Sequence, residues 1–319
     1  MIALFFIILI LFIILLVILG ISYYAFRITF LAPPHLDENH YFVPEGPQYE
    51  ALMEEIKLSV KRMAVRKYES VTITSYDGTR LFARYFHMDA HAPLQILFHG
   101  YKSSSLLDCS GGTYFSHLLK HNTLVVDQRS HGASEGTVIT FGIKERRDCL
   151  AWIQYGISRL GKDVPIILSG LSMGASTVLM AADLPLPSNV KGIIADCPYT
   201  SPKEIILKVG KERGFPPFLM YPFLRLGATV FGHFNLEESS AITAIKNTRL
   251  PILIFHGEED NFVPCEMSRR MSLEGKEHIT LVTIPGAGHG LSYLVDPDLY
   301  EYSIKKFLSE LSIPFPESV

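Results

Sequence analysis

The chain has 319 residues, of which 48% are hydrophobic and 19% charged, so it has enough apolar side chains for a large core and too little charge for a disordered chain. The formal net charge is −3 and no long Lys/Arg run appears, so the electrostatic pattern of a nucleic-acid-binding protein is missing. Four cysteines lie far apart without a C-x-x-C pair, which argues against a disulfide-rich scaffold and a zinc ribbon. Because no nucleotide-binding loop or metal motif appears either, we expect neither a cofactor nor a metal.

Residues 1–30 are predicted to form a transmembrane anchor. The stretch from Met1 to Ile21 is apolar apart from Gly20, and about 20 helical residues match the hydrocarbon thickness of a bilayer. Aromatic residues and Arg27 follow, as is typical of the membrane–water interface. A signal peptide fits poorly, because no basic segment precedes the apolar run and no A-x-A site follows it. A buried core helix is the other alternative. Arg27 and the unpaired cysteines favour a single-pass protein with a cytoplasmic C-terminal domain.

Residues 31–67 are predicted to hold a linker and an amphipathic helix. The linker, residues 32–48, contains four prolines and no hydrophobic periodicity. Apolar side chains then recur at helical spacing, at Leu52, Ile56, Val60 and Met63. An alternating stretch over 71–73, an Asp-Gly pair at 77–78 and a second strand over 81–86 predict a β-hairpin.

Residues 68–319 are predicted to form one α/β domain with a mostly parallel central sheet and helices on both faces, because strands alternate with helical patterns. A last helix is expected after Pro297. The interval of about 200–249 is too long for a simple crossover, and it is helical and rich in proline, which predicts a cap insertion over the sheet. Buried strands are predicted over residues 95–98, 123–126, 166–169, 192–195, 252–255 and 280–283.

The most informative motif is G-x-S-x-G, formed by Gly170, Ser172 and Gly174. It directly follows the predicted strand 166–169 and precedes a run of helix formers. In a nucleophile elbow the chain turns sharply from strand to helix, so the flanking positions must be glycine and the serine is strained with its hydroxyl exposed. The motif alone is weak, but this strand–motif–helix context makes Ser172 a candidate nucleophile.

A serine nucleophile needs a base, and the base needs a group that orients it. After a G-x-S-x-G nucleophile, the acid and then the histidine are expected further along the chain. Asp260 follows the strand 252–255, and His289 lies among glycines after the strand 280–283. Both therefore lie past the carboxyl ends of strands, where open α/β sheets build their sites. Asp260 has an alternative interpretation as a turn residue or helix cap.

Two backbone N–H groups are expected to form an oxyanion hole. One belongs to Met173, the residue after the candidate nucleophile. The other is assigned to Tyr101, in the loop after the predicted strand 95–98, and only its backbone is required.

With these residues the sequence resembles the α/β-hydrolase superfamily, and within it bacterial membrane-anchored members of the serine-aminopeptidase-like and lipase-like group. The resemblance spans about residues 68–311 and includes the stretches 97–100, 127–134 and 195–198. It implies Ser172 as nucleophile, Asp260 as acid, His289 as base, and Tyr101 and Met173 as oxyanion donors. Many lipase-like relatives have glycine where Lys102 stands. The resemblance also suggests structural roles for His99, His131 and His256, and we expect Arg129 to pair within its own turn.

The sequence therefore predicts a membrane-anchored serine hydrolase that cleaves carboxylic esters through an acyl-enzyme intermediate. Its substrate would be a small-molecule or lipid-like ester. An amide- or peptide-cleaving enzyme is the first alternative, because the same triad serves both reactions. An inactive hydrolase fold acting as a membrane-tethered binding module is the second. The apolar cap stretch 215–234 is either a lipid-facing lid or simple packing over the sheet. Removal of residues 1–30 is expected to leave a soluble, active protein.

Overall fold

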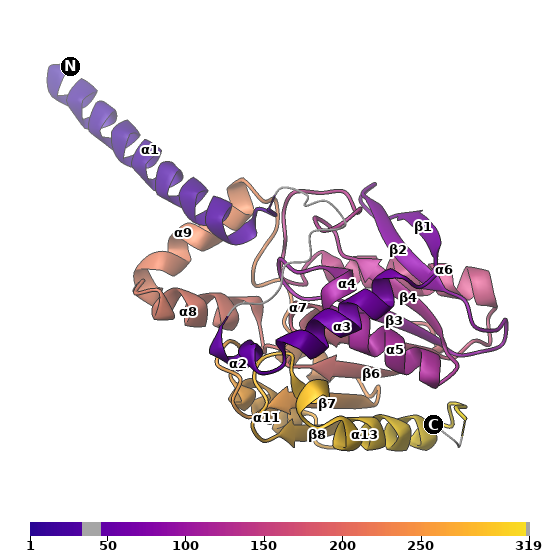
Figure 1. Ribbon diagram of the computed structural model, residues 1–319. Coiled ribbons are helices and arrows are strands. Elements are labelled where there is room, and N and C mark those ends of the chain that lie inside the picture. The colour runs from indigo at the N-terminus through magenta and orange to yellow at the C-terminus, as the bar shows by residue number, and fades with distance from the viewer. Residues whose placement is uncertain (34–45, 317–319) are drawn as a thin grey trace.

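The computed structural model describes residues 1–33 and 46–316, and most of the predicted linker lies outside these ranges (Figure 1). An eight-stranded sheet forms the centre, in the order β1-β2-β4-β3-β5-β6-β7-β8. β1 and β2 form the predicted antiparallel hairpin, β2 also pairs antiparallel with β4, and the remaining neighbours are parallel. The mostly parallel α/β sheet is thus confirmed. The strands are β1 (Glu69–Thr74), β2 (Arg80–Phe86), β3 (Leu94–Phe98), β4 (Asn122–Asp127), β5 (Ile166–Leu171), β6 (Val190–Asp196), β7 (Ile252–Gly257) and β8 (Ile279–Ile284).

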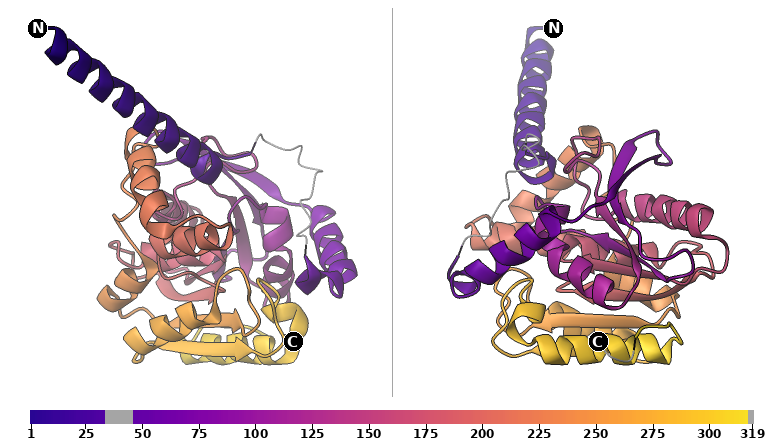
Figure 2. Two further views of the ribbon diagram at one scale, coloured as in Figure 1. Left: turned by 90° about the vertical axis from the view of Figure 1, so that its left-hand side faces the viewer. Right: turned by 45° about the vertical axis from the view of Figure 1, so that its right-hand side comes forward.

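Helices cover both faces of the sheet, as predicted (Figure 2). Trp152 of α6 and Val178 of α7 belong to a large core on one face, to which α10 and α11 also contribute. Phe115 of α5 and Phe307 of α13 pack on the other face against Ile194 of β6. The helices are α1 (Ile2–Phe30), α2 (Pro47–Glu50), α3 (Met53–Ala64), α4 (Ser105–Asp108), α5 (Ser110–Leu118), α6 (Glu145–Leu160), α7 (Met173–Ala181), α8 (Pro202–Glu212), α9 (Pro217–Val230), α10 (Ala241–Asn247), α11 (Cys265–Glu274), α12 (Ser292–Val295) and α13 (Pro297–Glu310).

The interval 200–249, expected as a cap, contains three helices with different surroundings. α8 and α9 stand away from the sheet beside the end of α1, as the views in Figures 1 and 2 show. α10 instead packs against α7. All three helices contribute buried side chains to the main core, among them Ile206 of α8, Ala228 of α9 and Ile245 of α10. Of the three, α8 and α9 are the ones that project toward α1.

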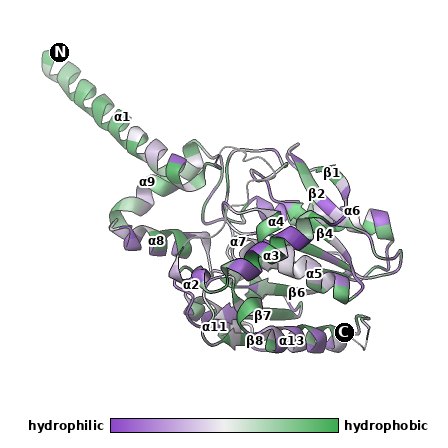
Figure 3. Ribbon diagram, viewed as in Figure 1, coloured by the Kyte–Doolittle hydropathy of each residue, from purple (hydrophilic) through white to green (hydrophobic). Residues whose placement is uncertain are grey.

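The N-terminal helix α1 is long and apolar enough to cross a membrane, and its first part projects freely from the domain (Figure 3). Its last two turns are different, because Phe26 and Phe30 are buried in the domain core. The Phe30 ring contacts Phe141 and Phe234, with centroids 5.8 Å and 5.3 Å away. A fragment beginning after residue 30 would lack these two core side chains, so removing residues 1–30 should lower the stability of the domain; whether the fragment is soluble and active stays a prediction.

α1 and α9 cross at close range because Gly227 has no side chain. A Cβ at Gly227 would lie only 2.5 Å from the carbonyl oxygen of Ser22 and 2.9 Å from the Cβ of Phe26. The ring of Phe231, just past α9, adds an edge contact with Tyr23 at 5.1 Å. The apolar helix and the projecting helix pair are therefore packed into one unit.

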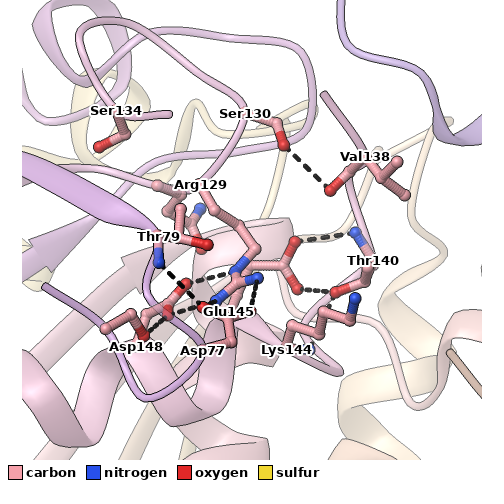
Figure 4. Close-up of polar contacts among 12 residues, drawn as sticks. Asp77, Thr79, Arg129, Ser130, Ser134, Val138, Thr140, Lys144, Glu145 and Asp148 are labelled. Carbon is pink, nitrogen blue, oxygen red and sulfur yellow. Dashed lines mark hydrogen bonds and ion pairs between the residues drawn. The ribbon is translucent and has the colours of Figure 1, made fainter. Parts of the chain in front are cut away.

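A buried ionic network fixes the loop between β4 and α6, residues 128–144 (Figure 4). Arg129 donates hydrogen bonds to both carboxylate oxygens of Asp148, each at 2.6 Å, and also binds Asp77 at 2.9 Å. The expectation that Arg129 pairs within its own turn is wrong, since its partners lie in the β1–β2 turn and in α6. Arg129 therefore connects these distant segments through its ion pairs. Within the same region, Glu145 accepts a hydrogen bond from the backbone N–H of Thr140 at 2.8 Å.

Candidate active site

Ser172 lies in the sharp turn between β5 and α7. Its backbone has φ 54° and ψ −111°, a conformation that non-glycine residues rarely adopt. A Cβ at Gly170 would lie 2.3 Å from the backbone of Gly174, and one at Gly174 would lie 2.1 Å from the carbonyl oxygen of Phe98. Both flanking positions must therefore be glycine, which is the physical reason for the G-x-S-x-G spacing.

The three residues predicted as a triad lie together at the carboxyl edge of the sheet. Ser172 Oγ is 3.0 Å from His289 Nε2, and His289 Nδ1 is 2.6 Å from Asp260 Oδ2. Asp260 lies in the loop after β7 and His289 in the loop after β8. Because the Asp260 carboxylate accepts a hydrogen bond from His289 Nδ1–H, the imidazole proton lies on Nδ1. The lone pair of Nε2 then points toward the serine hydroxyl.

The carboxylate of Asp260 is saturated with hydrogen bonds. Oδ1 accepts from the backbone N–H groups of Phe262 and Val263, both at 2.8 Å, and Oδ2 also faces His256 Nε2 at 3.3 Å. Burial raises the pKa of Asp260, but the hydrogen bonds from His256 and His289 outweigh it and hold the pKa well below its usual value. The acid is therefore a carboxylate in a fixed geometry.

His256 also contacts the carboxylate of Asp260, beyond the structural role that the resemblance suggested for it. Its side chain is fully buried, Nδ1 lies 2.7 Å from Ser268 Oγ, and Nε2 lies 2.8 Å from the carbonyl oxygen of Val263. The ring is thereby held against Asp260. The spacing of four residues between His256 and Asp260 is the only signal of this contact in the sequence.

The loop after β3, residues 99–104 and here called the β3–α4 loop, lies directly beside Ser172. A Cβ at Gly100 would be 3.5 Å from the Cβ of Ser172. Tyr101, the expected oxyanion donor, follows Gly100, while Met173 is the first residue of α7, where backbone N–H groups lack intrahelical acceptors. The two predicted donors thus flank the serine from the loop and from a helix N-terminus, whose partial positive charge favours an anion.

Several side chains hold the β3–α4 loop in place. Asp108, which was not predicted from the sequence, accepts a hydrogen bond from the Gly100 N–H at 2.6 Å and from Ser103 Oγ at 2.7 Å. Its place in the helix after the loop gives no sequence signal beyond an acidic residue. The N–H of Lys102 donates to His131 Nε2 at 3.1 Å. Lys102 has a φ of 52°, in the region that favours glycine, at the position where the resemblance leads one to expect a glycine.

His99 and His131 are buried structural histidines. Burial lowers the pKa of His99 to about 4 and that of His131 to about 3, so both rings are neutral at pH 7. His99 accepts from the N–H of Gln128 at 3.1 Å and faces the carbonyl oxygen of Gly100 at 2.8 Å. Their role in holding loops by hydrogen bonds agrees with what the resemblance suggested.

A cavity of about 640 Å³ opens over these groups. Its lining includes Ser172, His289 and Tyr101, together with Phe262 and a set of apolar side chains. The short helix α2 contributes as well: Gln48 Oε1 accepts a hydrogen bond from the His289 N–H at 3.2 Å. A cavity of this size holds a small organic molecule. The further lining residues include Gln48, Tyr49, Leu97, Leu107, Phe115, Ile194 and Leu291.

Cys197, Asp260 and His289 bring three potential metal-binding atoms within 4.8 Å of one another. Burial raises the pKa of the Cys197 thiol well above its usual value, so the sulfur is held as a thiol rather than as the thiolate that binds metals. Asp260 and His289 are also occupied by their mutual hydrogen bond. This donor set suits a proton-transfer pair better than a metal ion.

Residues 95–301 match the model of the alpha/beta hydrolase family. The chain belongs to this family. Among curated proteins, this chain is 23% identical to the uncharacterized protein YqkD of Bacillus subtilis (strain 168), over 60% of this chain and 63% of that one, so the match spans less than two thirds of the relative.

Solved structures share the fold of this chain. The Pyrococcus furiosus esterase Pf2001 aligns with a TM-score of 0.64 and 20% identity, covering 88% of this chain and 98% of that one. Est1E from Butyrivibrio proteoclasticus, in a structure with ferulic acid bound, aligns with a TM-score of 0.57 and 23% identity, covering 76% of this chain and 99% of that one. At this identity the likeness concerns the fold.

Proposed function

We propose that this hydrolase cleaves carboxylic esters by acyl-enzyme chemistry, with Ser172 as nucleophile, His289 as base and Asp260 as the orienting acid. The observation that carries this proposal is the hydrogen-bonded series from Ser172 Oγ through His289 to Asp260 at a cavity lined largely by apolar side chains. A binding module would need none of these three residues in mutual contact.

In the acylation step, Ser172 Oγ attacks the ester carbonyl carbon while His289 Nε2 takes the hydroxyl proton. The C=O electron pair moves to oxygen, and the N–H groups of Tyr101 and Met173 stabilise the resulting oxyanion. Collapse of this intermediate expels the alkoxide, which takes the proton from His289 and leaves as an alcohol. Water then repeats the sequence on the acyl-Ser172 ester and releases the carboxylic acid. Asp260 stabilises the imidazolium in both halves.

The ester preference is inferred from the cavity and from the kind of protein that shares the fold. The cavity beside Ser172 has a mostly apolar lining, with charged side chains such as Lys102, Asp196 and Arg213 also present, and the apolar part favours an acyl group with hydrocarbon character. The Pyrococcus furiosus protein is an esterase by name, which supports the same class for this chain. Amide cleavage is the alternative that the assay must separate.

We further infer that α1 anchors the enzyme in a membrane and that the hydrolase domain lies on the cytoplasmic side. The apolar helix provides the length, and Arg27 follows its apolar part. The four cysteines are free and buried, as suits a reducing compartment. After a carbonate wash the full chain should remain in the membrane fraction; recovery of intact chain in the soluble fraction would refute the anchor.

The experiment that tests the activity combines a fluorophosphonate probe with p-nitrophenyl esters of graded chain length and matched p-nitroanilides. Wild-type protein should be labelled and should hydrolyse esters, and Ser172→Ala should abolish both. Ser158→Ala, at an exposed serine of α6 that does not line the cavity, is the matched control and should behave as wild type. Labelling of the Ser172→Ala protein at another residue would overturn the nucleophile assignment. If the enzyme cleaved the p-nitroanilides faster than the p-nitrophenyl esters, its proposed substrate class would change from esters to amides.

A further inference from the structure

The end of α1 meets the β3–α4 loop, which carries the proposed oxyanion donor. The hydroxyl of Tyr101 donates a hydrogen bond to the carbonyl oxygen of Thr29 at 2.6 Å. The ammonium of Lys102 donates to the carbonyl oxygen of Ile28 at 3.2 Å. Both carbonyls are among the last four of the helix, which have no intrahelical donor. Two consecutive side chains of this loop therefore cap the apolar helix.

The donors on the β3–α4 loop and the acceptors at the end of α1 have complementary charge. A helix C-terminus carries partial negative charge, so the Lys102 ammonium is favourable there. Burial raises the pKa of the Tyr101 hydroxyl, which keeps it protonated as a donor. The Tyr101 ring also stacks on Phe141 at a centroid distance of 4.8 Å, and Phe141 packs in turn against Phe30 of α1. The side chain of Tyr101 thus has one orientation, set by the helix end and by its neighbour.

The β4–α6 loop forms hydrogen bonds with both the end of α1 and the β3–α4 loop. The N–H of Ile139 donates to the carbonyl oxygen of Phe30 at 2.7 Å, and the N–H of Ala32 donates to that of Thr137 at 2.9 Å. The same loop presents His131 to the N–H of Lys102. The Arg129 network and the bond from Ser130 Oγ to the Val138 carbonyl, 3.0 Å long, fix this loop (Figure 4). The helix end, the β4–α6 loop and the β3–α4 loop form one hydrogen-bonded unit.

Anchoring alone does not require these bonds. The contact of α1 with α9 through Gly227 already attaches the helix to the domain. The bonds from Tyr101 and Lys102 instead connect the helix to a residue whose own N–H faces the reacting carbonyl in the proposed mechanism. An oxyanion donor must be held to within about 0.5 Å to be effective, and the rest of the loop is fixed through Gly100 and Lys102 on either side.

We propose that the docked end of α1 positions the Tyr101 N–H at the oxyanion hole, with the Tyr101 hydroxyl and the Lys102 ammonium as the positioning groups. The apolar helix is then a functional part of the active site. This inference rests on the proposed serine-hydrolase function.

The test uses full-length protein in phosphatidylcholine vesicles and the variants Tyr101→Phe and Lys102→Met. The first keeps the ring on Phe141 and removes the donor to Thr29, and the second removes the donor to Ile28 at the surface. Each should lower kcat for p-nitrophenyl butyrate about tenfold, less than the 10²–10³-fold of a lost oxyanion donor. KM should stay within about twofold, because the substrate ground state has no oxyanion. Rates are expressed per site titrated by a fluorophosphonate, so that unfolded protein is not counted.

A trifluoromethyl ketone of the same acyl length provides the second readout, because its serine adduct carries an oxyanion. Its affinity should fall by the same factor as kcat in both variants. Tyr155→Phe, which removes a hydroxyl bonded to Arg159, and Lys203→Met, which removes a lysine over the Tyr221 ring, are the matched controls and should match wild type. Unchanged kcat and ketone affinity, or a loss confined to KM, would overturn the positioning role. Turnover by Ser172→Ala would instead refute the underlying function.

Discussion

The acid assignment predicts the effect of Asp260→Asn in detail, because every acceptor position of that carboxylate is occupied. Oδ1 accepts two backbone N–H groups, so the amide oxygen of asparagine must take its place. The amide NH2 then replaces Oδ2 and faces His289 Nδ1. A donor at that point forces the imidazole into the tautomer with its proton on Nε2, pointing at Ser172. The ring can no longer take the serine proton.

We expect kcat for p-nitrophenyl butyrate to fall by roughly 10³–10⁴-fold with little change in KM. At about 1.4 kcal/mol for each factor of ten, this is about 4–5.5 kcal/mol of transition-state stabilisation. The rate of fluorophosphonate labelling should fall in parallel, because it needs the same proton transfer.

The control for this prediction is Glu258→Gln. Glu258 accepts hydrogen bonds from Thr283 at 2.7 Å and from Arg269 at 3.2 Å on the exposed side of the loop, so its variant should stay within roughly tenfold of wild type. Glu259→Gln, at a neighbouring exposed position, should do the same. If Asp260→Asn stayed within tenfold while either glutamate variant lost its activity, the acid would be misassigned.

Three further predictions concern stability. Burial raises the pKa of Asp196 to about 6, so the folded protein binds this proton more tightly than the unfolded chain and loses stability as the pH rises from about 4 to 6. Asp196→Asn should remove that loss and add about 3 kcal/mol at pH 7, measured as a flatter dependence of Tm on pH; an unchanged pH profile would contradict it. Arg129→Met should cost about 3–5 kcal/mol in urea denaturation, because it leaves Asp148 buried without its cation, whereas a cost under 1 kcal/mol would mean that the network is not needed. Phe30→Ala should also cost about 3–5 kcal/mol in the same assay, since the ring is fully buried, and a wild-type midpoint would show that the end of α1 is not part of the core.

The sheet and the three candidate active-site residues could be predicted because their signals are local. Each buried strand is a short apolar run, and Ser172, Asp260 and His289 each follow one of them. Parallel strands bring their carboxyl ends to one edge, so the chain order of the three residues was enough to predict that they meet.

Contacts between distant segments left no such signal. Arg129 forms ion pairs with Asp148 and Asp77 only because the folded chain brings α6 and the β1–β2 turn next to the β4–α6 loop. The aromatic residues near the end of α1 fit the composition of a membrane interface, yet the Phe26 side chain is buried in the domain. Aromatic side chains suit both environments, and composition does not distinguish them.

The burial of Phe30 also has a consequence for how the protein is made. Its helix is synthesised before the ring partners Phe141 and Phe234, which follow much later in the chain. The core on this side of the sheet therefore closes only when a late segment returns to an early one, a long-range step that is slow in folding. Until those segments have been synthesised, the Phe30 ring has no core partners. The domain can therefore complete its core only in contact with the apolar helix.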